Sequence, residues 1–252
     1  MVRFLVTNDD GIEAQGLAAL EEALREIGNV YTVAPDSEMS GASHSLTLTR
    51  PLRIRNVDEH RWSVDGTPAD CVIIGYRKIL QVGGEKVICL SGINHGENLG
   101  DDATYSGTVA AALQATILGM PSLALSLATR KIGGILDFTN AARVAVASVR
   151  KVLAEGLPSE ILLNINIPEG QLNGARLTRL GVKQTKIVFS DHLDPRGKTY
   201  YWNREEYLAS TYQEGTDLHA IEKGLVSITP LSRDLTNYSA LRKLKTWNSR
   251  FD

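Results

Sequence analysis

Cysteine, net charge and long apolar runs are all scarce in this sequence. Only two cysteines, Cys71 and Cys89, occur among 252 residues, and they form no CxxC pair. Because a chain of this length needs no disulfide to fold, we expect a reducing compartment and a cytoplasmic protein. The formal net charge of -2 gives no electrostatic reason to expect nucleic-acid binding. No apolar run approaches a membrane span, and the N-terminus lacks the pattern of a signal peptide.

The composition does provide the material of a globular core. Hydrophobic residues make up 43% of the chain and charged residues 22%, which suits a soluble protein. The length is at the upper end for one domain, and the chain shows neither an internal repeat nor a low-complexity segment. We therefore expect a single domain over residues 1–252.

The chain opens with a strand–helix–strand pattern. Phe4 to Val6 is a short apolar run, as in a buried strand of a parallel sheet, and leucines at helical spacing follow it. A second apolar run, residues 30–34, ends at Pro35. Further strands are predicted at 87–90, 121–127, 161–167 and 225–231, and further helices from 68 and over 105–119, 139–153 and 238–247. This alternation predicts an α/β fold, a Rossmann-like three-layer sandwich with a mostly parallel sheet.

Two segments depart from this alternation. Residues 46–65 alternate loosely and predict an antiparallel ribbon. Residues 183–216 predict a protruding C-terminal β-hairpin arm, with strands at 186–190 and 198–202. Four of the eight tyrosines lie between 200 and 212, and an isolated two-stranded ribbon is only marginally stable in water. We therefore expect the arm to pack on another subunit, and the alternative is that it folds back on its own.

Oxygen-bearing side chains follow three of the predicted strands. Asp9 and Asp10 come directly after the first strand, and Ser40 lies in the loop after the second. Asn94 and Asn98 follow a later strand. Ligands bind at the carboxyl ends of strands in open α/β sheets, and two close carboxylates repel unless a proton or a cation lies between them. Such oxygen ligands suit Mg²⁺, Mn²⁺ or Ca²⁺ and not zinc. The alternative to a metal site is that Asn8 to Gly11 form a solvated Asn-Asp-Asp-Gly turn.

A second feature points to an anion. Ser106, Gly107 and Thr108 open the helix predicted at 105–119, where free backbone N–H groups and the helix dipole favour a negative charge. A metal site together with such a helix start indicates a phosphate ester as the ligand. The alternative is that Ser106 and Thr108 only cap the helix.

Several blocks, in their order and spacing over roughly residues 1–127, closely resemble the SurE family. They are Leu5-Val6-Thr7-Asn8-Asp9-Asp10-Gly11, Ser40-Gly41, Asp65-Gly66-Thr67-Pro68-Ala69-Asp70-Cys71, Ser91-Gly92-Ile93-Asn94, Asn98-Leu99-Gly100 and Tyr105-Ser106-Gly107-Thr108-Val109-Ala110-Ala111. Ser227 to Leu231 is similar to the late strand of the family. Residues 170–220 are too different to carry any residue over.

The resemblance implies a divalent-metal-dependent phosphatase, a 5'-nucleotidase that hydrolyses nucleoside 5'- and 3'-monophosphates and also short polyphosphate. It implies that one cation, Mg²⁺ or Mn²⁺, is held by four residues: Asp9, Asp10, Ser40 and Asn94. It places four others near the bound phosphate: Asn98, Ser106, Gly107 and Thr108. Members of the family form dimers or tetramers through C-terminal elements, so a homodimer or homotetramer is expected.

The mechanism we expect is direct hydrolysis, with Asp9, Asp10 and Asn94 as the catalytic residues around the metal. The alternative is a covalent phosphate on Asp9, but its neighbours lack the Asp-x-Asp followed by Thr or Val that this chemistry uses. His95 or His44 could protonate the leaving group, or both could be surface residues. The competing functions are a non-catalytic nucleotide-binding module and a regulatory protein with a vestigial metal site.

Overall fold

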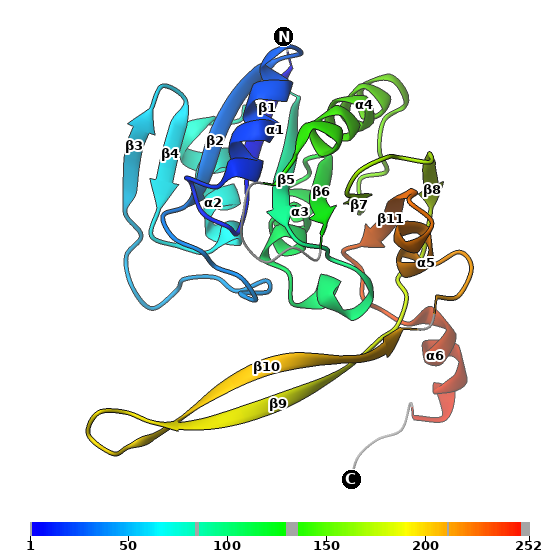
Figure 1. Cartoon of the computed structure of the whole chain (residues 1–252). Helices are drawn as coiled ribbons and strands as arrows, with labels where there is room; N and C mark the ends of the chain where they lie inside the picture. Colours follow the sequence, from blue (N-terminus) through cyan, green and yellow to red (C-terminus); the bar gives the residue numbers. More distant parts are fainter. Residues whose placement is uncertain (1, 84–85, 130–135, 211, 248–252) are drawn as a thin grey trace.

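The computed structural model of this chain describes residues 2–83, 86–129, 136–210 and 212–247. The strands of its sheet are β1 (Arg3–Thr7), β2 (Asn29–Pro35), β3 (Ile54–Asp58), β4 (Arg61–Val64), β5 (Val87–His95), β6 (Ser122–Ala128), β7 (Ile161–Pro168), β8 (Ala175–Leu177) and β11 (Val226–Ser232). The helices are α1 (Gln15–Arg25), α2 (Pro68–Ile74), α3 (Gly107–Ile117), α4 (Thr139–Glu155), α5 (Asp217–Glu222) and α6 (Tyr238–Lys243). A hairpin of β9 (Lys183–Leu193) and β10 (Thr199–Ser210) projects from the body (Figure 1).

Within the described residues, nine strands form one sheet in the order β3-β4-β2-β1-β5-β6-β7-β11-β8. All neighbours from β4 to β7 in this order are parallel, whereas β3 and β11 join β4 and β7 antiparallel. The carboxyl ends of β1, β2 and β5 therefore lie at the same edge of the sheet, the lower edge in Figure 1. The loops that follow these strands meet at that edge.

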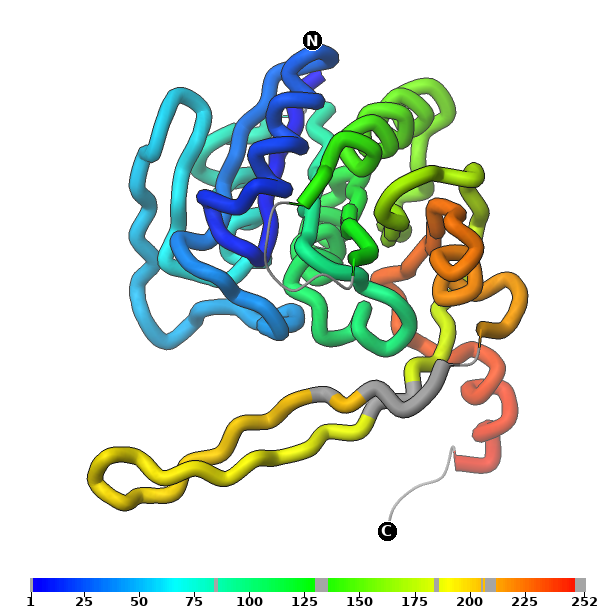
Figure 2. Tube along the Cα trace, in the orientation of Figure 1, coloured from blue at the N-terminus to red at the C-terminus, as the bar shows by residue number. Residues whose placement is uncertain are grey.

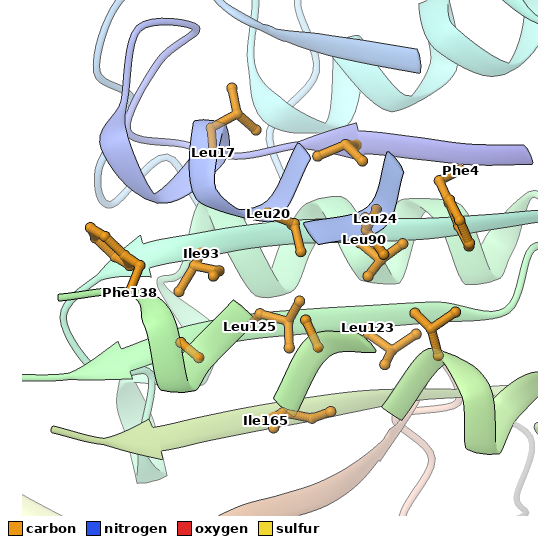
Figure 3. Close-up of a cluster of buried hydrophobic side chains, with 14 of the residues drawn as sticks. Phe4, Leu17, Leu20, Leu24, Leu90, Ile93, Leu123, Leu125, Phe138 and Ile165 are labelled. Carbon is orange, nitrogen blue, oxygen red and sulfur yellow. The ribbon is translucent and has the colours of Figure 1, made fainter. Parts of the chain in front are cut away.

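Side chains of β1 alternate between the two faces of the sheet. Phe4 and Val6 belong to a buried cluster with Leu20 of α1, a cluster that α4 also covers (Figure 3). Leu5 lies in a second cluster on the opposite face, with Val72 of α2. Burying each such side chain contributes about 1.5–3 kcal/mol to the stability of the fold, so packing on both faces of the sheet stabilises β1. The α/β three-layer architecture with a mostly parallel sheet is thus confirmed.

The predicted elements are present with shifted ends. The antiparallel ribbon expected over 46–65 is confined to β3 and β4, because residues 46–53 form no strand. In that stretch the backbone N–H of Thr47 donates to the carboxylate of Asp70 instead of to a neighbouring strand. The helix expected over 105–119 begins at Gly107 and follows a 3₁₀ turn, Gly100–Thr104. None of the helices in the described part of the chain combines the length and apolar character needed to cross a bilayer.

The C-terminal β-hairpin arm is confirmed. Its two strands are longer than predicted, and their pairing ends at Ser210 instead of at the predicted boundary of the arm, residue 216. β9 and β10 pair antiparallel from Lys183 with Ser210 to Leu193 with Thr199. Figures 1 and 2 show the arm extending along one side of the body from a root near α5. Phe189, Leu193 and Trp202 are 66%, 68% and 65% exposed, so the described part of their own chain does not cover them. The side chain of Tyr207, which contributed to the prediction, lies outside the described residues.

Candidate active site

A pocket of about 200 Å³ lies where β1 and β5 end. Several residues predicted from the sequence line it together: Asp9, Ser40, Asn94, Asn98 and Ser106. A second pocket of about 380 Å³ shares Ser40 and His95 with the first and includes Asp10. The structure therefore brings the residues predicted at three strand ends and the start of α3 to one place. Asn94 lies within β5, which extends to His95, and not in the loop predicted after residue 90.

Asp9 follows β1 and is almost fully buried, with 4% of its surface exposed. The hydroxyl of Thr108 donates a hydrogen bond to its Oδ1 atom. Burial raises the pKa of Asp9 above its ordinary value of 3.8, and hydrogen bonds from Thr108 and from nearby backbone groups only partly oppose this. A buried carboxylate of this kind becomes easier to ionise when a cation lies beside it.

Asp10 is half-buried beside Asp9. Its Oδ2 atom accepts a hydrogen bond of 3.1 Å from the backbone N–H of His95, at the end of β5. Burial raises the pKa of Asp10 to about 6, with the charge of Asp9 adding to the shift and His95 opposing it. Gly11 has a φ of +96°, a backbone conformation that glycine adopts more readily than other residues, directly after the two carboxylates. The two carboxylates are thus close enough to repel each other.

The Ser40 loop and Asn94 present further oxygen atoms. The backbone N–H of Met39 donates to the carbonyl oxygen of Asp9 at 2.7 Å, which ties this loop to the end of β1. Ser40 is exposed and donates its hydroxyl hydrogen to Glu38 at 2.8 Å, so its oxygen lone pairs can face a cation. Asn94 donates from Nδ2 to the carbonyl oxygen of Gly96 at 2.9 Å, which orients its side-chain oxygen.

Asn98 is held by a buried polar group that the sequence analysis missed. Its backbone N–H donates to Oδ1 of Asn166 at 2.8 Å, and its Nδ2 donates to the hydroxyl of Ser126 at 2.8 Å. Nδ2 of Asn164 donates to the carbonyl oxygen of Asn98, also at 2.8 Å. Asn164 and Asn166 are fully buried. The sequence did contain a sign of this contact, since Asn164 and Asn166 occupy alternate positions of an otherwise apolar strand. Buried amide side chains need hydrogen-bond partners, so two such residues indicate a polar contact inside the protein.

The start of α3 faces Asp9. Ser106 caps the helix, since its hydroxyl oxygen accepts a hydrogen bond of 3.0 Å from the backbone N–H of Val109. This is the capping role that the sequence left as an alternative. A Cβ atom at Gly107 would lie 2.8 Å from both Cβ and Oδ2 of Asp9, so only glycine lets the helix approach this closely. The helix start and the first carboxylate are therefore packed as one unit.

The two candidate histidines differ in position. His95 lines both pockets, is exposed, and has its ring centroid 5.3 Å from that of Phe138. Nε2 of His44 lies 2.9 Å from Oε1 of Gln114, and His44 lines neither of these pockets of the described structure. The structure thus brings His95, and not His44, to the predicted site.

The donor set fits a hard cation. Among the described residues, no group of three or more His, Cys, Asp or Glu side chains is arranged to hold a metal ion. An ion here would need neutral ligands besides Asp9 and Asp10, and the hydroxyl of Ser40 and the amide oxygen of Asn94 are of that kind. The raised pKa values of both carboxylates fit such an ion, because a cation relieves their desolvation and their mutual repulsion.

Comparison with known proteins agrees with the resemblance. The family profile described as Survival protein SurE matches residues 4–187. A protein named 5'-nucleotidase SurE from Pelobacter propionicus is 47% identical over 249 residues, covering 98% of this chain and 99% of that protein. One of the same name from Aquifex aeolicus is 46% identical over 249 residues, covering 97% and 98%. The crystal structure of Sure protein from Aquifex aeolicus matches with a TM-score of 0.84 at 45% identity, covering 98% of this chain and 100% of that one. The chain therefore belongs to the Survival protein SurE family.

Proposed function

We propose that this chain is a 5'-nucleotidase, which hydrolyses nucleoside 5'-monophosphates to a nucleoside and phosphate. The observation that carries the proposal is the meeting of Asp9 and the start of α3 at one pocket, with Asp10 at its side. Relatives such as the Pelobacter propionicus protein bear the name 5'-nucleotidase SurE. We include nucleoside 3'-monophosphates and short polyphosphate as substrates, because they present the same terminal phosphate group.

The proposed reaction depends on one divalent cation, Mg²⁺ or Mn²⁺, held by four residues: Asp9, Asp10, Ser40 and Asn94. When bound, such a cation would neutralise a phosphate oxygen and lower the pKa of a water molecule. The protein holds both carboxylates in place, Asp9 through the hydroxyl of Thr108 and Asp10 through the backbone N–H of His95. This preorganisation supports direct hydrolysis with Asp9, Asp10 and Asn94 as catalytic residues.

The proposed phosphate-binding residues are Asn98, Ser106, Gly107 and Thr108. The hydroxyl of Thr108 donates to Asp9, so its part at the site is to hold that carboxylate beside the phosphate. Asn98 is fixed by Asn166 and Ser126, which supports a positioning role at the pocket. The Ser106 hydroxyl uses its oxygen as a helix cap, so its hydrogen can be donated to a phosphate oxygen. We assign protonation of the leaving oxygen to His95, because it lines both pockets.

The second pocket, of about 380 Å³, is the proposed place of the nucleoside, since it shares Ser40 and His95 with the first. We also propose that the chain forms a homodimer or homotetramer. The exposed aromatic residues of the arm support this, because aromatic residues are enriched at interfaces between subunits. A cytoplasmic location is proposed as well, supported by the free, buried thiols of Cys71 and Cys89.

The test is release of inorganic phosphate from a panel of nucleoside 5'- and 3'-monophosphates, with and without EDTA. We expect EDTA to abolish release reversibly, and Asp9→Asn and Asp10→Asn each to remove most of kcat. Asp58→Asn, at an exposed aspartate of β3, is the matched control. Near-normal turnover of Asp10→Asn in saturating Mg²⁺ or Mn²⁺ would contradict the assignment. Nucleotide binding without phosphate release would favour the non-catalytic binding module instead.

A further inference from the structure

Lys183, the first residue of the arm, reaches the candidate active site. Its Nζ atom lies 2.9 Å from Oε1 of Glu97 and also forms an ion pair with Asp102. The Lys183 side chain is only 10% exposed and each of the two carboxylates 25%. A partly buried ion pair is screened less by solvent than a surface pair. Removing the lysine therefore leaves two carboxylate charges that act more strongly on their surroundings.

Glu97 and Asp102 both line the pocket of about 200 Å³ that contains Asp9. A phosphate monoester is an anion, and each carboxylate in this pocket repels it. No lysine or arginine is among the residues that line the pocket in the described part of the chain. The proposed divalent cation would offset the charge of Asp9, and Lys183 offsets part of the charge of Glu97 and Asp102 through its ion pairs with them.

The position of Lys183 is fixed by the buried carboxylate of Asp217, at the start of α5. Its Oδ1 atom accepts from the backbone N–H of Gly181 at 2.7 Å, and its Oδ2 atom accepts from that of Gly100 at 2.8 Å. Asp217 is fully buried. It therefore joins the chain just before the arm to the loop that carries Glu97 and Asp102, which holds the lysine against both carboxylates.

We propose that Lys183 is a positioning residue of the phosphate pocket, which offsets part of the negative charge of Glu97 and Asp102 so that an anionic substrate can enter. This inference rests on the proposed function. Because Lys183 begins β9, the charge balance of the pocket is set by the root of the arm. The residue acts on binding of the phosphate group and does not touch the reacting atoms.

The decisive variant is Lys183→Met, which keeps the apolar stem and removes the charge. We expect KM for a nucleoside 5'-monophosphate and the inhibition constant of inorganic phosphate to rise together by about tenfold, because the carboxylate charges that Lys183 offsets would then repel the phosphate group more strongly. We expect kcat to stay within about threefold, since no interaction specific to the transition state is lost. Lys183→Arg should remain near wild type. Lys186→Met, at an exposed lysine of the same strand, is the matched control.

A charge-rescue variant separates this role from a merely structural one. Combining Lys183→Met with Glu97→Gln and Asp102→Asn removes the two carboxylate charges that Lys183 no longer offsets, so KM and the phosphate inhibition constant should return toward wild type. A structural defect at the arm root would not be rescued in this way. If Lys183→Met does not fold, the triple variant decides alone: a raised KM in it would overturn the proposal.

Failure of this inference is distinguishable from failure of the proposed function. If Asp10→Asn is inactive but Lys183→Met shows an unchanged KM and unchanged inhibition by phosphate, the nucleotidase proposal stands and the role of Lys183 is rejected. If Asp10→Asn keeps near-normal turnover, the proposed metal site is rejected first, and with it the basis for assigning the pocket to phosphate.

Discussion

The hydroxyl of Thr108 donates a hydrogen bond to the carboxylate of Asp9, which lies 99 residues earlier in the chain. The bond joins the first turn of α3 to the end of β1, and it satisfies the hydroxyl of a threonine that is fully buried. We infer that Thr108 fixes the orientation of a carboxylate that burial alone would destabilise.

Replacing Thr108 with valine keeps the shape of the side chain and removes this bond. We expect kcat to fall by about 10- to 100-fold, the range typical for loss of a group that orients a metal-binding carboxylate. Thr108→Ser keeps the hydroxyl and should stay close to wild type. Steady-state kinetics at saturating Mn²⁺ provide the measurement, and equal kcat values for the two variants would refute the role.

Gly107→Ala tests the close approach of the helix start to Asp9. The new Cβ atom would lie 2.8 Å from Asp9, so the carboxylate or the helix must shift. We expect KM and the inhibition constant of inorganic phosphate to rise together, and kcat to fall as well. Gly119→Ala is the control for a general loss of stability. A Cβ atom at Gly119 would meet nothing within 4 Å, and the φ of +84° makes alanine strained there, so this variant adds strain away from Asp9. A Gly107→Ala enzyme with unchanged phosphate inhibition would count against the proposed phosphate site.

The pKa of Asp10 predicts how the stability of the metal-free protein depends on pH. Burial raises this pKa from 3.8 to about 6, so the folded state binds the proton more tightly than the unfolded state does. Ionisation of Asp10 therefore destabilises the fold progressively as pH rises through this window, fully so above it. At about 1.36 kcal/mol for each pKa unit, the destabilisation reaches at most about 3 kcal/mol.

Asp10→Asn should accordingly raise Tm of the EDTA-treated protein near pH 8 and change it little near pH 4. Added Mn²⁺ should raise Tm of the wild-type protein near pH 8 far more than that of the variant, because the cation binds the carboxylate. Thermal unfolding followed by circular dichroism provides both measurements. Identical Tm values for wild type and variant near pH 8 would show that Asp10 carries no such penalty.

The arm is predicted to hold subunits together. Residues 187–205 can be replaced by a short Gly/Ser linker, a change that leaves Lys183 and its ion pairs in place. We expect light scattering to show an oligomer for the intact protein and a smaller species for the linker variant, since exposed aromatics such as Trp202 are typical of interfaces. A monomeric intact protein at micromolar concentration would reject the oligomer, and an unchanged oligomer would place its interface elsewhere.

Much of the fold was predictable because its signals are local. The apolar run at Phe4 to Val6 and the leucines of α1 each indicate an element by themselves, and a parallel sheet then places the loops after its strands at one edge. That reasoning correctly gathered Asp9, Ser40 and Asn94 at one pocket. It did not require knowledge of any contact between distant side chains.

The parts that escaped prediction depend on such contacts. Asn164 meets Asn98 across 66 residues, and Lys183 meets Glu97 across 86, with no local pattern that pairs them. The loss of ribbon structure at 46–53 has the same origin, since the carboxylate of Asp70 takes the backbone N–H of Thr47. Hydrogen bonds between segments far apart in sequence become visible only when the sheet has placed them.

The tip and the root of the arm differ in what they contact. Figure 2 shows the tip of the hairpin, the turn between β9 and β10, far from the root of the arm. The root is joined to the pocket by the ion pairs of Lys183 with Glu97 and Asp102. We therefore expect the two ends to evolve at different rates. The tip is free to diverge along with whatever surface it contacts, but substitutions at the root are constrained by the chemistry of the substrate.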